Sequence, residues 1–164
     1  MTSRASARVL LAACLLAGTI LPEGSARGED TLVWTANANG GLITLNYGSL
    51  DASKPPVLLL SCFNEMDIAV LEIFGAIEGT RPGQELSIDI SAGDAKSSSK
   101  GEASIDDKTG AMFAEASDVK ITPLLEVLKA PGPLTVKTAL TARTLPELGR
   151  ADAADKFSTD CQVK

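Results

Sequence analysis

The sequence contains no histidine, and its aromatic residues are few: one tryptophan, one tyrosine and four phenylalanines among 164 residues. Imidazole is the base of Ser-His-Asp and Cys-His nucleophile systems and a frequent ligand of zinc, copper and haem iron. The absence of histidine excludes every catalytic or metal site that is built on an imidazole group. We therefore predict no metal site, no cofactor and no catalytic residue of these nucleophilic types.

Basic residues are also in the minority. The chain has 15 Lys and Arg residues against 21 Asp and Glu residues, which gives a net charge of −6 at pH 7. Nucleic acids and anionic membrane surfaces attract proteins mainly through clustered positive charge, so we expect neither as a partner. Beyond residue 26 no apolar run reaches the roughly 20 residues of a membrane-spanning helix, so we expect no membrane span.

The first 26 residues are typical of a secretory signal peptide. Arg4 and Arg8 supply a positive start, residues 9–21 are apolar, and Ala26 ends a run of small residues suited to cleavage. An apolar helix of this length rises only about 20 Å, less than the roughly 30 Å hydrocarbon core of a membrane. Cleavage after residue 26 leaves residues 27–164 as a single β-rich domain with 13 basic and 20 acidic residues, a net charge of −7. We expect this domain in a periplasm or outside the cell.

Cys14 offers an alternative. Residues 11–14, Leu-Ala-Ala-Cys, resemble a bacterial lipobox, in which the cysteine becomes the lipidated first residue. The apolar run continues past Cys14, however, whereas a processing site closes the apolar region. A discarded signal peptide therefore explains the segment better than a lipid anchor does.

Two cysteines, Cys62 and Cys161, remain in residues 27–164. Disulfides form in exported proteins, so we predict one bond between these residues. It closes a loop of about 100 residues, which the chain-entropy model values at about 4.7 kcal/mol. Two free thiols and intermolecular pairing are the alternatives, and the spacing does not fit a C-x-x-C redox pair.

Short apolar segments separated by turn residues dominate the chain. Residues 84–91 alternate most clearly, with Leu86, Ile88 and Ile90 on one face. The continuous apolar run of residues 57–63 indicates a strand that is buried on both faces or near the sheet centre. We predict eight strands, at residues 31–36, 42–47, 57–63, 68–77, 84–91, 96–105, 112–119 and 134–142. This pattern favours a mainly β fold, either an antiparallel β-sandwich or a small barrel.

A short helix is predicted near residues 122–130. Thr122 suits a helix cap, Pro123 suits the first helical position, and Lys129 suits the C-terminal end. Leu124 and Leu128 lie one helical turn apart, and we expect the apolar face that they form to plug one end of the β core.

A second helix is predicted at the C-terminus, over residues 145–161. Pro146 suits its start. Apolar residues recur there at helical spacing, namely Leu148, Ala151, Ala154, Phe157 and Cys161. Such a helix would lie across the sheet and direct Cys161 inward.

The candidates for partner binding are Trp34, Tyr47 and Arg81. Trp34 and Tyr47 fall on a predicted hairpin, where exposed rings would anchor a partner. Packing in the core is the alternative for both, because aromatic residues are enriched in strands for that reason. Arg81 precedes a Pro-Gly pair and is either a recognition residue or an ordinary turn residue.

Residues 96–105 are polar and serine-rich, which indicates an exposed edge strand or a mobile hairpin arm. Ser97 and Lys100 match the S-x-x-K motif of serine β-lactamases, and residues 108–110 match K-T-G. In those enzymes the serine opens a helix and K-T-G lies on a distant strand. Here both motifs lie close together in a polar segment, so we interpret the match as coincidental.

Carboxylates are the remaining candidates for chemistry. Asp89 and Glu115 lie on predicted strands, and Asp106, Asp107 and Asp118 lie in or near turns, without the spacing of a calcium loop. A glycosidase-like pair forms in three dimensions, so spacing alone does not identify one. Solvated surface charge is the ordinary interpretation.

The Trp-bearing first strand, the cysteine at the end of an apolar strand and the terminal Leu-Pro…Phe-x-x-x-Cys pattern resemble small exported two-cysteine proteins of alphaproteobacteria, which have no assigned function. The resemblance extends over most of residues 27–164 and rests on Trp34, Cys62, Leu145-Pro146, Phe157 and Cys161. It implies a disulfide-stapled fold and no particular activity.

We therefore predict a periplasmic, non-catalytic binding or interaction module with an envelope protein as its partner. The prediction rests on the absence of imidazole and of a convincing nucleophile. A hydrolase that acts through carboxylates and a carrier of a small apolar ligand are the alternatives.

Overall fold

The computed structural model describes residues 31–75, 77, 79–139 and 141–163. The predicted signal peptide, with Cys14, lies outside the described residues. The strands are β1 (Leu32–Asn39), β2 (Leu42–Ser49), β3 (Leu58–Phe63), β4 (Ile68–Phe74), β5 (Glu85–Ala92), β6 (Ala95–Ile105), β7 (Met112–Ser117), β8 (Leu134–Thr138) and β9 (Thr141–Leu145), and the helices are α1 (Ile121–Lys129) and α2 (Arg150–Asp160).

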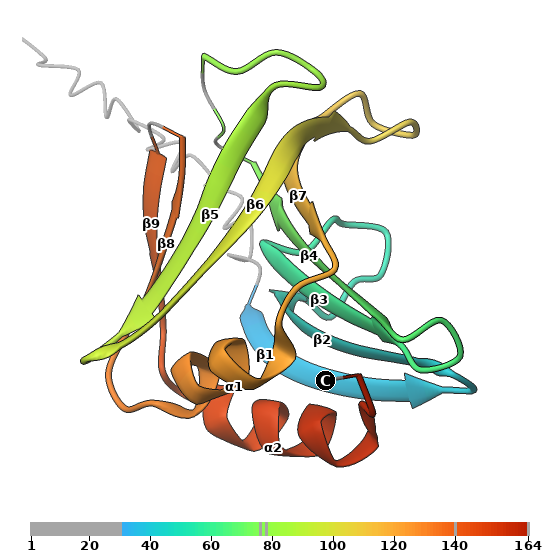
Figure 1. Ribbon diagram of the computed structural model, residues 1–164, viewed down its shortest axis with the longest axis vertical. Helices are drawn as coiled ribbons and strands as arrows, with labels where there is room; N and C mark the ends of the chain where they lie inside the picture. The colour runs from blue at the N-terminus through green and yellow to red at the C-terminus, as the bar shows by residue number, and fades with distance from the viewer. Residues whose placement is uncertain (1–30, 76, 78, 140, 164) are drawn as a thin grey trace, which may run out of the picture.

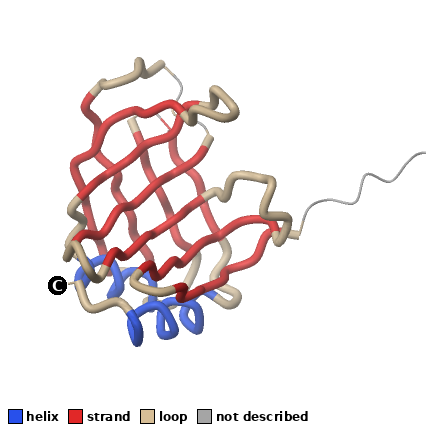
Figure 2. Tube along the Cα trace, turned by 90° about the vertical axis from the view of Figure 1, so that its right-hand side faces the viewer, coloured by secondary structure: helices blue, strands red, loops and turns tan. Residues whose placement is uncertain are grey.

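The strands form one antiparallel sheet in the order β1-β2-β3-β4-β7-β6-β5-β8-β9. The sheet is strongly curved, with β1 to β4 on one side of the molecule and β5, β6, β8 and β9 on the other (Figure 1). Both helices lie at one end of the sheet (Figure 2). The mainly β, antiparallel fold predicted from the sequence is confirmed. The sheet is open, because no ladder joins its edge strands β1 and β9 within the described chain.

The core lies between the two sides of the sheet. Alternate residues of each strand point inward: Leu58, Leu60 and Cys62 of β3 and Ile88 and Ile90 of β5 are each at most 2% exposed. These side chains belong to one buried cluster, which also contains the apolar faces of α1 and α2. β3 has a paired strand on both sides, as its continuous apolar run predicts.

The segment predicted as one strand at residues 134–142 is instead a hairpin of two strands, β8 and β9. Ala139 lies in the turn between them with a φ of 47°, in the left-handed region that L-residues rarely adopt. The usual marker of a tight hairpin loop is Asn-Gly or Asp-Gly, and neither occurs here. The eight-strand prediction is therefore one strand short.

Both helices begin at residues other than those predicted. α1 begins at Ile121 and its N-cap, Lys120, makes no side-chain cap bond, so the prediction that Thr122 caps this helix is wrong. α2 begins at Arg150, since residues 141–145 belong to β9. Leu148 precedes the helix and is 90% exposed, whereas the buried face of α2 consists of Arg150, Ala153, Ala154 and Phe157. In the described part of the chain, neither helix is long and apolar enough to cross a membrane.

Cys62 and Cys161 are joined by a disulfide, as predicted. The bond connects β3 to the residue that follows α2. The Asn64 side chain reinforces this junction, because its Nδ2 donates to the Asp160 carbonyl at 2.9 Å and its Oδ1 accepts from the Gln162 N–H at 2.8 Å. The C-terminal segment is thus fastened to the end of β3 on both sides of Cys161.

Removal of the disulfide by the double substitution Cys62→Ala and Cys161→Ala is expected to lower the free energy of unfolding by about 3–5 kcal/mol, because a long closed loop restricts the unfolded chain. Urea unfolding at pH 7 measures the loss. Asn64→Ala keeps the disulfide and is the matched control, with an expected loss of about 1–2 kcal/mol. Equal stability of the double variant and the parent protein would contradict the prediction.

Candidate functional site

Two of the three partner-binding candidates lie in the core. Trp34 and Tyr47 are each 8% exposed, and their rings are in contact, with centroids 4.9 Å apart. Trp34 Nε1 donates to the Pro146 carbonyl at 2.9 Å, which ties β1 to the segment after β9. Arg81 is exposed in the connection between β4 and β5. The structure therefore pairs the two aromatic rings inside the molecule and leaves Arg81 at the surface.

Strands β6 and β7 pair along only part of their length. Their ladder runs from Glu102 opposite Glu115 to Ile105 opposite Met112. At the adjacent Gly101, a Cβ atom would lie 2.1 Å from the carbonyl oxygen of Glu115, so only glycine permits this approach. Beyond Gly101, β6 stays paired with β5 and β7 with β4, and the two strands diverge.

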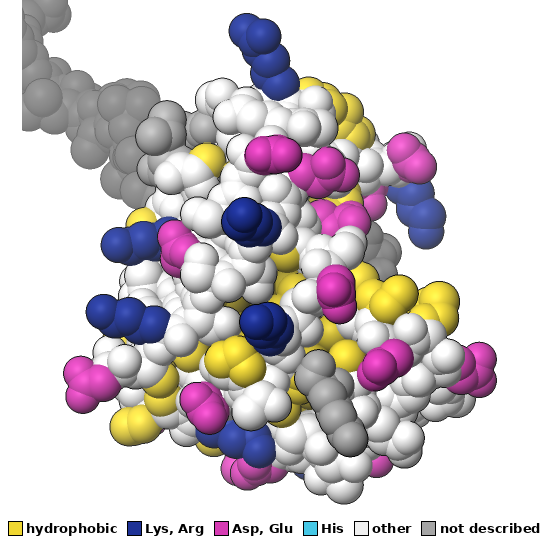
Figure 3. All heavy atoms as spheres, viewed as in Figure 1, with side chains coloured by type: hydrophobic (Ala, Val, Ile, Leu, Met, Phe, Trp, Pro, Cys, Tyr) yellow, Lys and Arg dark blue, Asp and Glu magenta, His cyan; other side chains and the backbone are white. Residues whose placement is uncertain are grey.

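A cleft of about 420 Å³ occupies the space between the diverging strands. One wall is formed by residues 96–100 of β6, and the other by residues 117–120 and Pro123, where β7 leads into α1. Asp118, with a φ of 57°, turns the chain at the end of β7. Figure 3 shows Lys and Arg side chains projecting from this face of the molecule.

The edge of β6 that faces the cleft has no strand partner. The Ala103 N–H donates to the Gln84 carbonyl at 2.9 Å, so the backbone groups of Ala103 point toward the β5 side. The direction of these groups alternates along an antiparallel ladder. The N–H and C=O groups of Lys96, Ser98 and Lys100 therefore point away from β5 and toward the cleft, and none of the described residues pairs with them.

The cleft is positively charged. It is lined by Lys96, Lys100 and Lys120 with a single acidic residue, Asp118, although the whole chain has a net charge of −6. None of the three lysines forms an ion pair with a described residue. The cleft thus carries positive charge that is not neutralised within the described structure.

The serines of residues 97–99 are divided between the two faces of β6. Ser98 lies on the outer face, where its hydroxyl donates to the Asp89 carboxylate, and Ser97 and Ser99 lie on the inner face. Residues three apart on a strand point to opposite faces, so the side chains of Ser97 and Lys100 diverge. The S-x-x-K match therefore forms no pair of nucleophile and base.

Two further hollows border β6. One, of about 620 Å³, extends over β5, β6 and β7, and the other, of about 500 Å³, is lined by residues that include Asp89, Lys96 and Lys137. Both hollows are open to solvent. β6 is the element that all three hollows share.

Four glutamates form one row across the outer face of the sheet. Glu72 of β4, Glu115 of β7, Glu102 of β6 and Glu85 of β5 lie directly opposite one another from strand to strand. Burial raises the pKa of Glu72, and the negative charges of Glu115 and Asp106 raise it further. Among the described residues, no group of three or more Asp, Glu or Cys side chains is placed to hold a metal ion.

α2 holds α1, which borders the cleft, through a buried arginine. Arg150 is 1% exposed and donates from Nε to the Leu128 carbonyl at 2.9 Å and from Nη2 to the carbonyls of Ala130 and Gly132. These carbonyls lie at and beyond the C-terminal end of α1, where positive charge is favourable. Burial lowers the pKa of Arg150, against a smaller opposing effect of Glu147, but a guanidinium stays charged at neutral pH.

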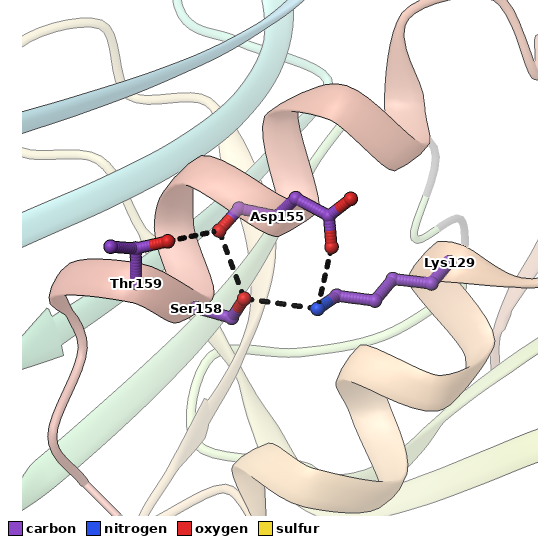
Figure 4. Close-up of polar contacts among 4 residues, drawn as sticks. All are labelled: Lys129, Asp155, Ser158 and Thr159. Atoms are coloured by element: carbon purple, nitrogen blue, oxygen red, sulfur yellow. Dashed lines mark hydrogen bonds and ion pairs between the residues drawn. The ribbon is translucent and has the colours of Figure 1, made fainter.

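An exposed contact joins the same two helices. Lys129 Nζ lies 2.7 Å from Oδ1 of Asp155 and donates to Ser158 Oγ at 2.9 Å (Figure 4). The side chains of Lys129 and Asp155 are 37% and 67% exposed, and ion pairs in water contribute little to stability. Arg150 therefore contributes more than Lys129 to the position of α1.

Comparison with known proteins found no matching family model, no matching curated protein and no matching solved structure.

None of the three partner-binding candidates lines the cleft, whereas Asp118, one of the candidate carboxylates, does. The predicted strand at residues 96–105 corresponds to β6. Its prediction as an edge strand is wrong for the strand as a whole, because β6 lies inside the sheet between β5 and β7, and only residues 96–100 lack a partner on the β7 side. The sequence does not show that β7 leaves β6 at Gly101, because that separation depends on contacts between residues far apart in the chain. The segment forms a hairpin with β5, because all eight β5 residues pair with β6.

Arg150→Met is expected to destabilise the protein strongly, because it leaves three carbonyls without a charged donor, and a hydrogen bond to a charged group contributes about 1.5–3 kcal/mol. Lys129→Met, the same change at the exposed contact, should alter stability by less than about 1 kcal/mol. Urea unfolding of both variants provides the test. Losses of equal size would contradict the role assigned to Arg150.

Glu72→Gln is expected to stabilise the protein at pH 7 by about 0.2–1 kcal/mol, because it removes like charges that face each other across strands. A raised pKa in the folded state means that Glu72 contributes stability while it is protonated, and that this contribution is lost as the pH rises through the folded-state pKa. The variant should therefore match the parent at about pH 3, where carboxyl groups are protonated in both states.

Denaturant unfolding at the two pH values measures the effect. The control is Glu126→Gln on the exposed surface of α1, which lies outside the glutamate row. A gain for Glu72→Gln that is as large at the acid pH as at pH 7 would rule out a charge effect.

Proposed function

We propose that the protein is an exported binding module without catalytic activity, and that the cleft beside residues 96–100 of β6 binds its partner. The observation that carries the proposal is the unpaired edge of β6 along a positively charged cleft. An unpaired strand edge is a template for another chain. Lys96, Lys100 and Lys120 add charge that no described residue pairs.

Two features support export. The N-terminal residues have the composition of a signal peptide, and the disulfide is a bond typical of oxidising compartments. An envelope protein is the partner that such a location favours.

The geometry favours binding over the two alternatives. A carrier of an apolar ligand needs a largely apolar pocket that encloses most of the ligand, whereas the three hollows beside β6 are open and lined mainly by polar and charged residues. A carboxylate-dependent hydrolase needs two carboxyl groups that flank the bond to be cleaved, whereas the glutamates of the row stand side by side on one face of the sheet, beside an open hollow.

Photo-cross-linking tests the proposal. A benzophenone amino acid in place of Ser117, which is exposed in the cleft wall, is expected to form an adduct with an envelope protein when the producing cells are irradiated. The matched control carries it in place of Ser53, which is exposed in the connection between β2 and β3. Mass spectrometry of the adducts identifies the partner.

A specific adduct from position 117 that position 53 does not give supports the proposal. The same adducts from both positions, or none from position 117, would remove the cleft as the binding surface. Hydrolysis of an envelope polymer that Glu115→Gln abolishes would replace the binding function with the hydrolase alternative.

A further inference from the structure

We infer that the partner contributes an extended, acidic polypeptide segment, which binds as an additional strand along residues 96–100 of β6. The inference rests on the proposed function, because it specifies what the cleft binds. It draws on the free backbone groups of β6, on the charges around them and on the small side chains of the inner face.

The free backbone groups match the requirements of a neighbouring strand. Lys96, Ser98 and Lys100 each present an N–H and a C=O toward the cleft, at the two-residue spacing of an antiparallel ladder. Main-chain hydrogen bonds of this kind provide affinity in strand-addition complexes. Since a strand rises about 3.3 Å per residue, the free edge accommodates a segment of roughly five residues.

The charges select the side chains of that segment. Residues directly opposite one another on paired strands place their side chains on the same face. Partner residues opposite Lys96 and Lys100 would therefore project beside these lysines on the outer face, where acidic side chains are favourable. Lys120 on the other wall adds a third positive charge.

The inner face of the cleft favours small residues at the intervening positions of the segment. Ser97 and Ser99 lie on that face, and Val119 and Pro123 form part of the opposite wall. The expected segment has acidic residues opposite Lys96 and Lys100, and small or β-branched residues opposite Ser97 and Ser99. Glu102 and Glu115 lie beyond Gly101, so the positive region ends there.

A second copy of this chain is disfavoured at the same edge when its β6 pairs about Ser98. Antiparallel pairing of two β6 strands about Ser98 would place Lys96 of one copy directly opposite Lys100 of the other, twice in one interface. Like charges directly opposite are destabilising in a sheet. The charges of Lys96 and Lys100 therefore favour a segment of a different, acidic protein over a second β6 strand in this register.

The test is titration of the exported, disulfide-bonded protein with a blocked peptide of alternating glutamate and valine, followed by calorimetry. We expect binding that weakens as salt is raised. A peptide of alternating lysine and valine should not bind. The third peptide keeps the glutamates but is N-methylated at every second amide, on the edge that would face β6, and should bind at least about tenfold more weakly.

Two matched pairs of protein variants complete the test. Ser98→Pro removes a cleft-facing N–H that makes no bond to β5, and edge strands tolerate proline at such positions; it should weaken binding at least about tenfold, whereas Ser98→Ala, which keeps the N–H, should have little effect. Lys100→Glu should weaken binding to a similar degree, and Lys156→Glu on the exposed surface of α2 should not. Amide exchange at Lys96, Ser98 and Lys100 should slow when the peptide is bound.

Two outcomes would overturn the inference. Equal binding of the N-methylated and unmodified peptides would show attraction by charge without strand pairing. Failure of the glutamate-valine peptide to bind at all would also reject it, even if Ser98→Pro does not fold. In either case a specific adduct from position 117 would leave the proposed function standing, whereas the absence of that adduct would reject both.

Discussion

The contact between Gly101 and the carbonyl of Glu115 is the constraint on which the cleft depends. On one side of this contact, β6 and β7 form the short ladder that connects the two sides of the curved sheet. On the other side, β6 pairs only with β5 and β7 pairs only with β4, so a gap opens between β6 and β7. The same close approach therefore joins the sheet and creates its gap. A Cβ at residue 101 would collide with the backbone of β7. Because the atoms that it meets belong to the backbone, a change of side-chain conformation could not relieve this clash.

Much of the fold follows from local pattern, because local pattern decides which face of a strand is buried. The alternation at residues 84–91 corresponds to β5, and the two cysteines after residue 26 form the predicted disulfide, Cys62–Cys161. The sequence does not predict the β8–β9 hairpin, because the positive φ of its turn is adopted by Ala139 and not by a Gly, Asn or Asp residue, which usually adopt it. The last helix starts late because Gly149, with a φ of 80°, is its N-cap, and the Pro146 start signal lies before that turn.

The candidate site was less predictable than the fold. Trp34 and Tyr47 are the only Trp and Tyr of the chain, yet rarity does not distinguish a core ring from an exposed one, and both are buried. The cleft is lined mainly by serines and lysines, which are common surface residues. Their proposed role in binding depends on the absence of a β7 partner beside residues 96–100 of β6. A single sequence shows that residues 96–105 suit a strand, but not where the β6–β7 ladder ends, because that depends on contacts between distant residues such as Gly101 and Glu115.

The lysines beside the free edge have two physical consequences that reinforce each other. They oppose pairing between copies of the chain, which is the hazard of any open strand edge, and they favour acidic side chains at contact. Attraction at a distance is weak, however, since charges are screened beyond about 8 Å at physiological ionic strength and the whole chain is negative. An acidic segment gains from the lysines only once it lies along β6. Charge therefore selects among segments that already pair through their backbones. Neither the charge of the lysines nor the backbone pairing alone defines the partner.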